Sequence, residues 1–402
     1  MRLKEICDYI SRGTTPDYVD ESPYKVMNQA TFSKGRLDED NIRYTSKNVR
    51  EAQIKKGDLL MASTGGGVLG KVFFFDSDDT SFYADSHVSI LRNSKGKNLM
   101  KYLYYVFSIK YDEINATMVK GSTNQTELQR NYLLAYEMDV PSLSKQQRIV
   151  DYLDAKLGKI DARIAVLVKQ QDAYARLKKS VVHHAVTRGL NPNVFLKDSG
   201  VEWIGMIPKH WELQRFKSIF TECKSVTETG QEDLLSVSEY YGVARRIDKM
   251  EDGEYESRAD SLVGYKVCKK DDLVINIMLA WKRGLGFSDF DGIVSPAYAV
   301  YRGKDIAPHY FHYLMRTDMY VAEYKRNSKG IIDSRLRMYT DRFNNIMAIV
   351  PPLSEQQAIA AYLDEKCSKI VAVTENIGKQ IDALKRLKRA LINEVVTGQR
   401  AV

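Results

Sequence analysis

Two long stretches of the chain carry apolar residues at every third or fourth position. In the first, these residues are Ile149, Leu153, Leu157, Ile160, Ile164 and Leu167, and in the second they are Ile359, Leu363, Cys367, Ile370, Ile377, Ile381 and Leu384. This spacing is typical of coiled-coil helices, and about 42 residues at 1.5 Å each make a helix of roughly 60 Å. The phase slips near Leu177 and Leu387, so we expect an imperfect supercoil there. Each helix must bury its apolar stripe, and we expect the two helices to pack against each other.

The two stretches are copies of one sequence, displaced by 210 residues. Residues 140–190 and 350–400 are identical at 23 of 51 positions, and the segment VPSLSKQQRI returns as VPPLSEQQAI. Prolines precede each copy, and we predict Ser144 and Ser354 as helix N-caps, with Gln147 and Gln357 completing capping boxes. In the first copy, Pro192 is the predicted stop. The chain therefore contains an internal duplication.

The segments before and between these helices are mixed in character and resemble each other faintly. Both contain short runs typical of strands (72–75 and 87–91; 273–277 and 298–301), a tyrosine-rich helical stretch (99–111; 309–324), and then a polar loop (121–125; 327–330). We predict an α+β protein in which two mixed α/β domains are separated by two long helices, packed as an antiparallel coiled coil with pseudo-twofold symmetry. The expected boundaries are 1–140, 141–190, 191–350 and 351–402.

Composition restricts the class of protein. No apolar run is long enough to span a membrane and the first residues contain no signal core, so we expect a cytoplasmic protein without membrane contact. The four cysteines lie far apart, which argues against a disulfide scaffold or a cysteine zinc module. The net charge of +8 permits a polyanionic partner without requiring one. The basic clusters 176–179 and 385–389 could approach phosphate or an acidic partner, or could form a solvated helix face.

No catalytic or metal-binding constellation emerges from the sequence. The run Gly65–Val72 approaches a phosphate-binding loop, but it ends in valine and leads into a predicted strand, so we interpret it as a turn between strands or a loop near DNA. Asn191-Pro192 is not the motif of an adenine methyltransferase, and no carboxylate cluster suggests a nuclease. His309 and His312 share a helical face without a third ligand nearby. We therefore expect a protein that recognises rather than catalyses.

Two dissimilar domains held apart by a helical spacer could each reach a separate groove of duplex DNA, because successive major grooves on one face recur about every 34 Å. Polar, basic and aromatic loop residues are candidates for contacts to phosphates and base edges. In the first domain these candidates are Ser63, Thr64, Gly65, Ser122, Thr123, Asn124 and Gln125, and in the second they are Asn276, Trp281, Lys282, Arg283, Ser328 and Lys329. Trp281 could equally belong to the core. A helical-hairpin scaffold that never binds DNA is the alternative, and a self-sufficient methyltransferase is a third hypothesis that no motif supports.

Several segments together resemble the specificity subunits of Type I restriction–modification systems. The resemblance lies in the paired PxLSxQQxI…YLD motifs (Pro141–Asp154 and Pro351–Asp364), and in the segments Lys197–Trp211, Ile10–Pro16, Lys56–Leu60 and Gly121–Thr123. It extends over essentially the whole chain. Many members begin with a counterpart of Trp203–Trp211, whereas this sequence starts directly at Met1-Arg2-Leu3; the family tolerates circularly shifted layouts.

The resemblance implies two target recognition domains, each binding one half of a split, asymmetric site on double-stranded DNA. The long helices would set the spacer and dock two methyltransferase (M) subunits, and a motor-nuclease (R) subunit would join for restriction. The helix residues implied in these roles are Gln146, Gln147, Tyr152, Leu153, Gln356, Gln357, Tyr362 and Leu363. The subunit itself would carry no cofactor or metal. S-adenosylmethionine, ATP and Mg²⁺ would be bound by the partner subunits, where adenine N6 is methylated.

Overall fold

The computed structural model describes residues 1–96, 99–120, 126–249, 261–332 and 335–402. The chain divides into two compact units, which are described separately below. Unit 1 comprises Met1–Val168 and Gly378–Val402, and unit 2 comprises Lys169–Ile377. Each unit contains one mixed domain and a part of both long helices, α6 (Leu143–Arg188) and α11 (Leu353–Val396). The domain limits given above stay predictions.

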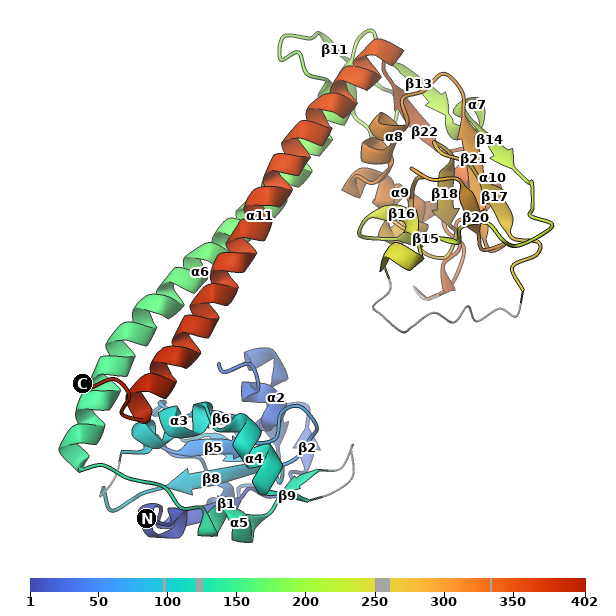
Figure 1. Ribbon diagram of the computed structural model, residues 1–402. Coiled ribbons are helices and arrows are strands. Elements are labelled where there is room, and N and C mark those ends of the chain that lie inside the picture. Colours follow the sequence, from blue (N-terminus) through green and yellow to red (C-terminus); the bar gives the residue numbers. More distant parts are fainter. Residues whose placement is uncertain (97–98, 121–125, 250–260, 333–334) are drawn as a thin grey trace. The chain divides into compact units, whose positions relative to one another are not determined.

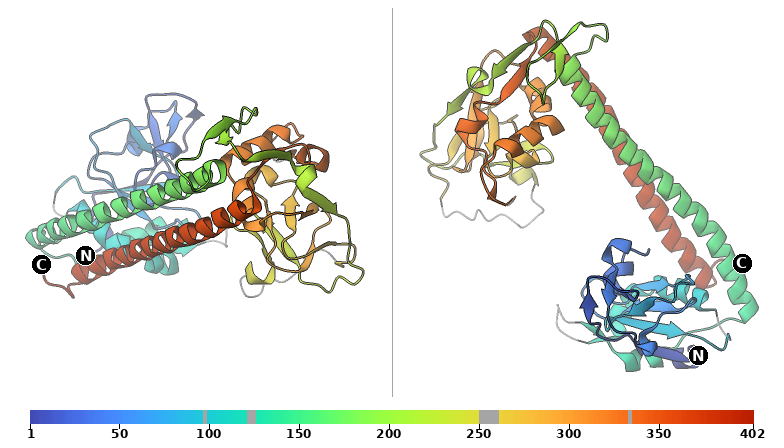
Figure 2. Two further views of the ribbon diagram at one scale, coloured as in Figure 1. Left: turned by 90° about the horizontal axis from the view of Figure 1, so that it is seen from above. Right: turned by 180° about the vertical axis from the view of Figure 1, so that it is seen from behind.

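The helices α6 and α11 pack antiparallel along their apolar stripes (Figures 1 and 2). Within unit 1, the Lys388 ammonium contacts the Asp161 carboxylate at 2.7 Å, and within unit 2 the Gln171 side-chain amide donates to the Thr374 carbonyl at 3.3 Å. Leu177 and Leu387 are 47% and 53% exposed, so both leave the seam where the apolar pattern slips. The predicted pair of antiparallel helices is confirmed.

The predicted caps of the long helices are wrong. Helix α6 begins at Leu143 and α11 at Leu353, so Ser144 and Ser354 lie inside the first turn. Proline is favourable at the start of a helix because its fixed φ suits the first turn, and α11 therefore begins directly after Pro352. At the other end of α6, Gly189 adopts a φ of +78° and donates its N–H to the Ala185 carbonyl at 3.0 Å, which closes the helix before Pro192 is reached.

In unit 1, two four-stranded sheets carry the domain. The elements before α6 are α1 (Leu3–Ile6), β1 (Tyr9–Arg12), β2 (Tyr18–Val19), β3 (Lys25–Met27), α2 (Gln29–Phe32), η1 (Glu39–Asn41), β4 (Arg43–Thr45), η2 (Arg50–Ala52), β5 (Leu59–Ala62), β6 (Val72–Phe74), β7 (Phe82–Ala84), β8 (Val88–Arg92), α3 (Met100–Ser108), α4 (Tyr111–Thr117), β9 (Val119–Lys120), β10 (Glu127–Leu128) and α5 (Arg130–Ala135). One sheet is antiparallel with the order β1-β8-β5-β6, and the other has the order β2-β4-β3-β7 with β3 and β7 parallel.

Unit 2 repeats the antiparallel sheet. Its elements between α6 and α11 are β11 (Leu196–Asp198), β12 (Met206–Pro208), β13 (Glu212–Arg215), α7 (Phe216–Ile219), β14 (Phe220–Cys223), β15 (Leu235–Ser238), β16 (Gly242–Arg245), η3 (Ile247–Lys249), β17 (Lys266–Cys268), β18 (Leu273–Asn276), η4 (Ala280–Lys282), β19 (Leu285–Phe287), β20 (Gly292–Val294), β21 (Tyr298–Gly303), α8 (Pro308–Met315), α9 (Asp318–Asn327), α10 (Thr340–Phe343) and β22 (Met347–Val350). The order β14-β21-β18-β19 matches β1-β8-β5-β6 strand for strand. The two domains therefore share a sheet although their sequences have diverged.

The central strands of these sheets bury both faces. In β5, Leu59 packs in the core beside the helices, and Leu60 packs in a second core on the opposite face. Leu273 and Val274 of β18 alternate in the same way. Alternation is expected because successive side chains of a strand point to opposite faces. The ends of α6 and α11 contribute to the helix-side core in each unit, so each domain is packed against the helix pair.

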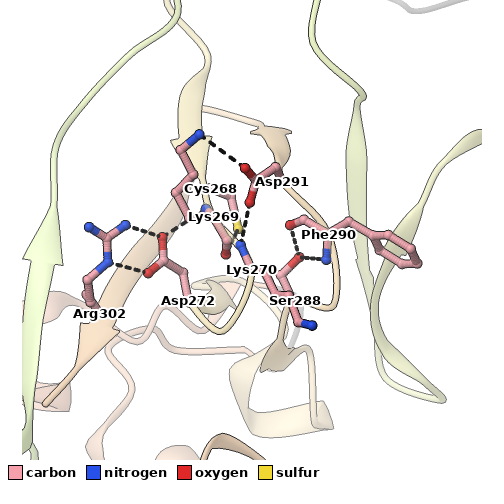
Figure 3. Close-up of polar contacts among 8 residues, drawn as sticks. All are labelled: Cys268, Lys269, Lys270, Asp272, Ser288, Phe290, Asp291 and Arg302. Carbon is pink, nitrogen blue, oxygen red and sulfur yellow. Dashed lines mark hydrogen bonds and ion pairs between the residues drawn. The ribbon is translucent and has the colours of Figure 1, made fainter.

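A buried aspartate that pairs with an arginine is common to the similar segments Lys55–Leu60 and Lys269–Val274. The Asp272 carboxylate accepts two hydrogen bonds from the Arg302 guanidinium, at 2.8 and 2.9 Å, and one from the Lys269 backbone N–H at 2.9 Å (Figure 3). In unit 1, Asp58 accepts two hydrogen bonds of 2.6 Å from Arg92. A bidentate pair of this kind fixes the turn before the strand to the neighbouring strand.

Candidate nucleic-acid interface

The first glutamine of each QQ motif joins the long helix to its domain. The Gln146 side chain donates to the Pro141 carbonyl at 2.9 Å and accepts from the Leu99 backbone N–H, at the start of α3, at 2.8 Å. Gln356 repeats both contacts with Pro351 and with Ala307, at the start of α8, at 2.8 and 2.9 Å. Both glutamines are 1% exposed. We call each set of contacts a helix–domain junction.

The aspartate of each YLD motif completes the junction. In unit 1, Asp154 accepts a hydrogen bond from the Tyr105 hydroxyl and pairs with Lys101 at 2.7 Å. In unit 2, the Tyr313 hydroxyl donates to Asp364 at 2.8 Å, and His309 contacts the same carboxylate at 3.1 Å. Burial first, and then the hydrogen bond to aspartate, raises the pKa of Tyr313, so this hydroxyl stays protonated as a donor.

The other helix residues implied by the resemblance separate into buried and exposed positions. Leu153 and Leu363 are fully buried in the cores of their own units. Gln147 and Gln357, in contrast, are exposed. Of these four side chains, those of Gln147 and Gln357 are the ones that face solvent.

Tyr152 and Tyr362 also occupy matching positions on the two helices. The Lys156 ammonium lies 5.7 Å from the centre of the Tyr152 ring, and the Lys366 ammonium lies 5.7 Å from the centre of the Tyr362 ring. Each tyrosine is half-buried at the edge of its core. These amphipathic surfaces are a second position at which a partner could contact both helices in the same way.

In unit 1, the candidate residues after β5 lie in different environments. Ser63 is fully buried, and its hydroxyl is within 2.6 Å of the Ser89 hydroxyl and 3.2 Å of the Met61 carbonyl. The Thr64 hydroxyl contacts the His87 imidazole at 2.7 Å, and Gly65 turns the chain with a φ of +95°. Ser63 therefore holds the turn together, whereas Thr64 and Gly65 reach its surface.

A second segment of unit 1 lies beside this turn. The Leu128 backbone N–H donates to the Ser63 carbonyl at 2.8 Å, and Thr64 forms an isolated β-bridge with Glu127. The structure therefore brings the β5–β6 turn next to the chain that follows the predicted polar loop. The candidates Ser122, Thr123, Asn124 and Gln125 in that loop lie outside the described residues.

The equivalent turn of unit 2, between β18 and β19, holds four of the candidates, of which Arg283 is described separately below. Asn276 is 4% exposed, and its side-chain oxygen accepts from the Met278 backbone N–H at 3.1 Å. The Trp281 indole donates to the Met278 carbonyl at 3.0 Å, while its ring lies 5.0 Å from the Lys282 ammonium and 5.3 Å from that of Lys325. Asn276 therefore has a structural role, and Trp281 with Lys282 forms the surface.

Arg283 is bound within the protein. It has a left-handed φ of +64°, donates its Nε–H to the Arg316 carbonyl at 3.0 Å, and forms an ion pair with Asp318. A guanidinium held in this way has fewer donors left for a guanine edge. The structure therefore favours a positioning or phosphate-binding role for Arg283 over specific base contact.

The two remaining candidates follow α9. The Ser328 hydroxyl donates to the Tyr324 carbonyl at 2.8 Å, and Lys329 is exposed beside a backbone bridge to Arg337. The Met338 N–H bonds to the Ile277 carbonyl at 2.8 Å, which brings this segment to the β18–β19 turn. The candidates of unit 2 therefore gather on one edge of the domain.

Some exposed side chains near these residues were missed by the sequence argument. Ile331 is fully exposed two residues after Lys329, and Tyr240 is 84% exposed after β15. Apolar and aromatic side chains at a nucleic-acid surface can stack on or insert between bases. Neither lies in a motif, and their exposure depends on the fold of segments that are distant in sequence.

Other site chemistries find no support in the part of the chain that the structure describes. There, no three His, Cys, Asp or Glu residues are grouped to hold a metal ion, and no helix is both long and apolar enough to cross a bilayer. Burial raises the pKa of the Cys7 and Cys268 thiols to about 12, so neither is a ready nucleophile. The Gly65–Val72 run joins β5 to strand β6, as the turn interpretation predicted.

Comparisons with known proteins agree with the sequence resemblance. Residues 1–166 match a family described as Type I restriction modification DNA specificity domain. The chain is 21% identical over 369 residues to the specificity subunit of the Type I restriction enzyme MjaVIII of Methanocaldococcus jannaschii, covering 87% of this chain and 80% of that protein.

Solved structures show the same fold. A chain from a study of complex assembly and conformational transition of the type I R-M system has a TM-score of 0.67 at 14% identity, covering 98% of this chain and 96% of that one. The HsdS subunit from Thermoanaerobacter tengcongensis has a TM-score of 0.50 at 14% identity, and the match covers 100% of this chain and 96% of that chain.

These similarities favour DNA recognition over the scaffold hypothesis. Residues 1–166 match the Type I restriction modification DNA specificity domain, and the chain is similar over most of its length to a specificity subunit of a Type I restriction enzyme.

Proposed function

We propose that each domain binds one half of a bipartite, asymmetric DNA site, with α6 and α11 setting the length of the unread spacer. The observation that carries this proposal is the shared sheet, β1-β8-β5-β6 in unit 1 and β14-β21-β18-β19 in unit 2, whose equivalent turns carry different side chains. Two domains with one architecture and different surfaces bind the same kind of polymer while contacting different bases.

The residues we assign to the DNA surface are those that the fold leaves accessible. In unit 1 these are Thr64 and Gly65, and in unit 2 they are Trp281, Lys282, Ser328 and Lys329. Ser122, Thr123, Asn124 and Gln125 remain in the proposal on their sequence alone. Lysine supplies phosphate contacts that fix position, and hydroxyl and amide side chains can hydrogen-bond to base edges.

The helices would also dock two methyltransferase subunits in equivalent ways. Support comes from two repeated pairs of positions, the exposed Gln147 and Gln357 and the half-buried Tyr152 and Tyr362, which offer the same contacts on both helices. A motor-nuclease subunit would join this assembly for restriction. S-adenosylmethionine, ATP and Mg²⁺ would be bound by these partners, which would methylate adenine N6 and cleave DNA.

Selection from a random duplex library, performed with the chain in complex with its methyltransferase partners, tests this function. The expected result is an enriched motif of two short sequences separated by a fixed number of unspecified base pairs. A single continuous motif, or no enrichment, would contradict the proposal. Exchanging residues 1–140 for the corresponding domain of another specificity subunit should then change one half-site and leave the other unchanged.

A further inference from the structure

Unit 2 contains a pocket of about 490 Å³, and half of the residues that line it are basic. Helix α6 contributes Lys178, Lys179 and His183, helix α8 contributes His312, and Arg283 and Arg316 complete the wall. Such a volume falls in the range of small-ligand sites. A pocket with this lining favours an anion.

Arg316 places an uncompensated charge in this wall. Its guanidinium donates to the carbonyls of Arg283 at 2.7 Å, Leu285 at 2.6 Å, Glu239 at 2.8 Å and Tyr240 at 3.1 Å. Within the described ranges, no carboxylate pairs with Arg316. Burial, followed by the charge of Arg283, lowers its pKa to about 10, which still leaves it cationic at neutral pH. A buried cation without a counterion is costly, and a bound anion would compensate it.

The single carboxylate of the pocket does not neutralise the remaining groups. Asp318 pairs with Arg283 and, at 3.3 Å, with Lys179. Lys178 has no carboxylate partner in the part of unit 2 that the structure describes. Burial lowers the pKa of His183 and, more strongly, that of His312, so both imidazoles are neutral and can donate one hydrogen bond each.

The matching pocket of unit 1 keeps basic residues of the long helix but lacks the basic pair contributed at α8. Tyr104 stands at the position of His312 and Ser108 at that of Arg316, 208 residues earlier in each case. Three carboxylates also line the unit 1 pocket, from Asp154, Asp161 and Asp382. Lys388 and Arg389 of α11, the repeat counterparts of Lys178 and Lys179, line it as well, so the basic helix residues are common to both units.

We propose that the pocket formed by Lys178, His183, His312 and Arg316 binds a phosphate group. The Lys178 ammonium and the two imidazoles can donate hydrogen bonds to phosphate oxygens. Arg316, whose terminal N–H groups donate to backbone carbonyls, contributes its positive charge. The phosphate could belong to the backbone of bound DNA or to a free nucleotide, whose base could stack on the exposed Tyr240 at the rim. The DNA source rests on the proposed function, whereas the free-nucleotide source does not.

Calorimetric titration of the full chain with inorganic phosphate and with AMP tests whether the pocket binds phosphate that is not part of DNA. Lys178→Gln and His312→Gln should each raise the dissociation constant at least about tenfold, because each removes a hydrogen bond or charge at the anion. Lys169→Gln is the matched control, since Lys169 is an exposed lysine of α6 outside the pocket. Thermal melting of each variant identifies any loss of fold.

The DNA source is tested by measuring duplex affinity against salt concentration with the same variants. Lys178→Gln should reduce the slope of log K against log salt by about 0.9, the value for one phosphate contact, without changing the selected motif. Loss of phosphate or AMP binding alone supports a free ligand, and a reduced slope alone supports backbone phosphate. If folded Lys178→Gln and His312→Gln match Lys169→Gln in both assays, the proposal is wrong. Wild-type protein that binds AMP but no duplex would contradict the proposed function and leave this pocket supported.

Discussion

The Gln356 side-chain oxygen accepts a hydrogen bond from the Ala307 backbone N–H at 2.9 Å, while its amide donates to the Pro351 carbonyl at 2.8 Å. Because Gln356 is buried, Gln356→Ala would leave both backbone groups without a partner. We expect this variant to lower the free energy of unfolding by about 2–4 kcal/mol, measured by urea denaturation followed by circular dichroism.

The neighbouring Gln357 is the control for this prediction. It is exposed, so Gln357→Ala should change the unfolding free energy by no more than about 0.5 kcal/mol. Equal effects of the two substitutions would contradict the role assigned to the helix–domain junction.

The internal repeat predicts a stabilising substitution at Asp271. This residue has a φ of +67°, and the matching residue of unit 1, Gly57, has a φ of +88°. Both donate their N–H across the same turn at 2.8 Å, to Ser288 and Phe75 respectively. Since glycine adopts this conformation without a Cβ penalty, Asp271→Gly should raise the unfolding free energy by about 0.5–1 kcal/mol. Gly57→Ala should lower the unfolding free energy by a similar amount. A decrease for Asp271→Gly together with an increase for Gly57→Ala would exclude a left-handed turn.

Unit 2 should lose stability as pH falls below the ordinary range of histidine. Burial, followed by the charges of Arg316 and His309, lowers the pKa of His312 to about 3; Lys178 acts in the same direction and Asp364 opposes it. Below about pH 6.5 the His312 imidazole binds a proton in the unfolded chain but stays neutral in the folded chain. Its contribution to the free energy of unfolding is therefore fully present above pH 6.5 and is lost as the pH falls toward 3.

Urea unfolding at pH 7.5 and 5.5 measures this loss. His312→Gln should remove about 1 kcal/mol of the pH dependence shown by the wild type. The imidazole signal of His312 in NMR spectra should also stay unchanged between these pH values. A signal that titrates near pH 6.5 would show that the side chain is not held in its neutral form.

Lengthening the helix pair should lengthen the unread spacer. Four residues added within 157–168 of α6, with four added in the facing stretch 378–392 of α11, extend both helices by about 6 Å, or roughly two base pairs. Library selection should then return both original half-sites at a wider separation. Changed half-sites with an unchanged spacer would show that the helices do not determine the separation.

The periodic features of the fold could be predicted from the sequence. The repeated spacing from Ile149 to Leu167 is sufficient to predict an antiparallel helix pair, because a single apolar stripe must be buried. The strand runs at 72–75 and 273–277 were equally visible. The helix starts were misjudged because α11 begins at Leu353, directly after Pro352, so that Ser354 lies inside the first turn.

The environment of individual loop residues could not be predicted in the same way. Ser63 is buried because its hydroxyl lies against Ser89, a residue 26 positions away, and Arg283 is occupied by contacts to Arg316 and Asp318. Contacts between residues that are distant in sequence decide which polar side chains face solvent, and no local pattern records them.

The two helix–domain junctions use the same few groups: a glutamine amide, a backbone N–H at a helix start, and an aspartate that holds a tyrosine hydroxyl. A domain attached through these few contacts can change at its other surface positions and still stay packed against the helix pair. Genetic recombination between related subunits, with crossovers inside the repeated helix segment, would therefore yield chimeras in which both junctions stay intact while the domains are newly combined.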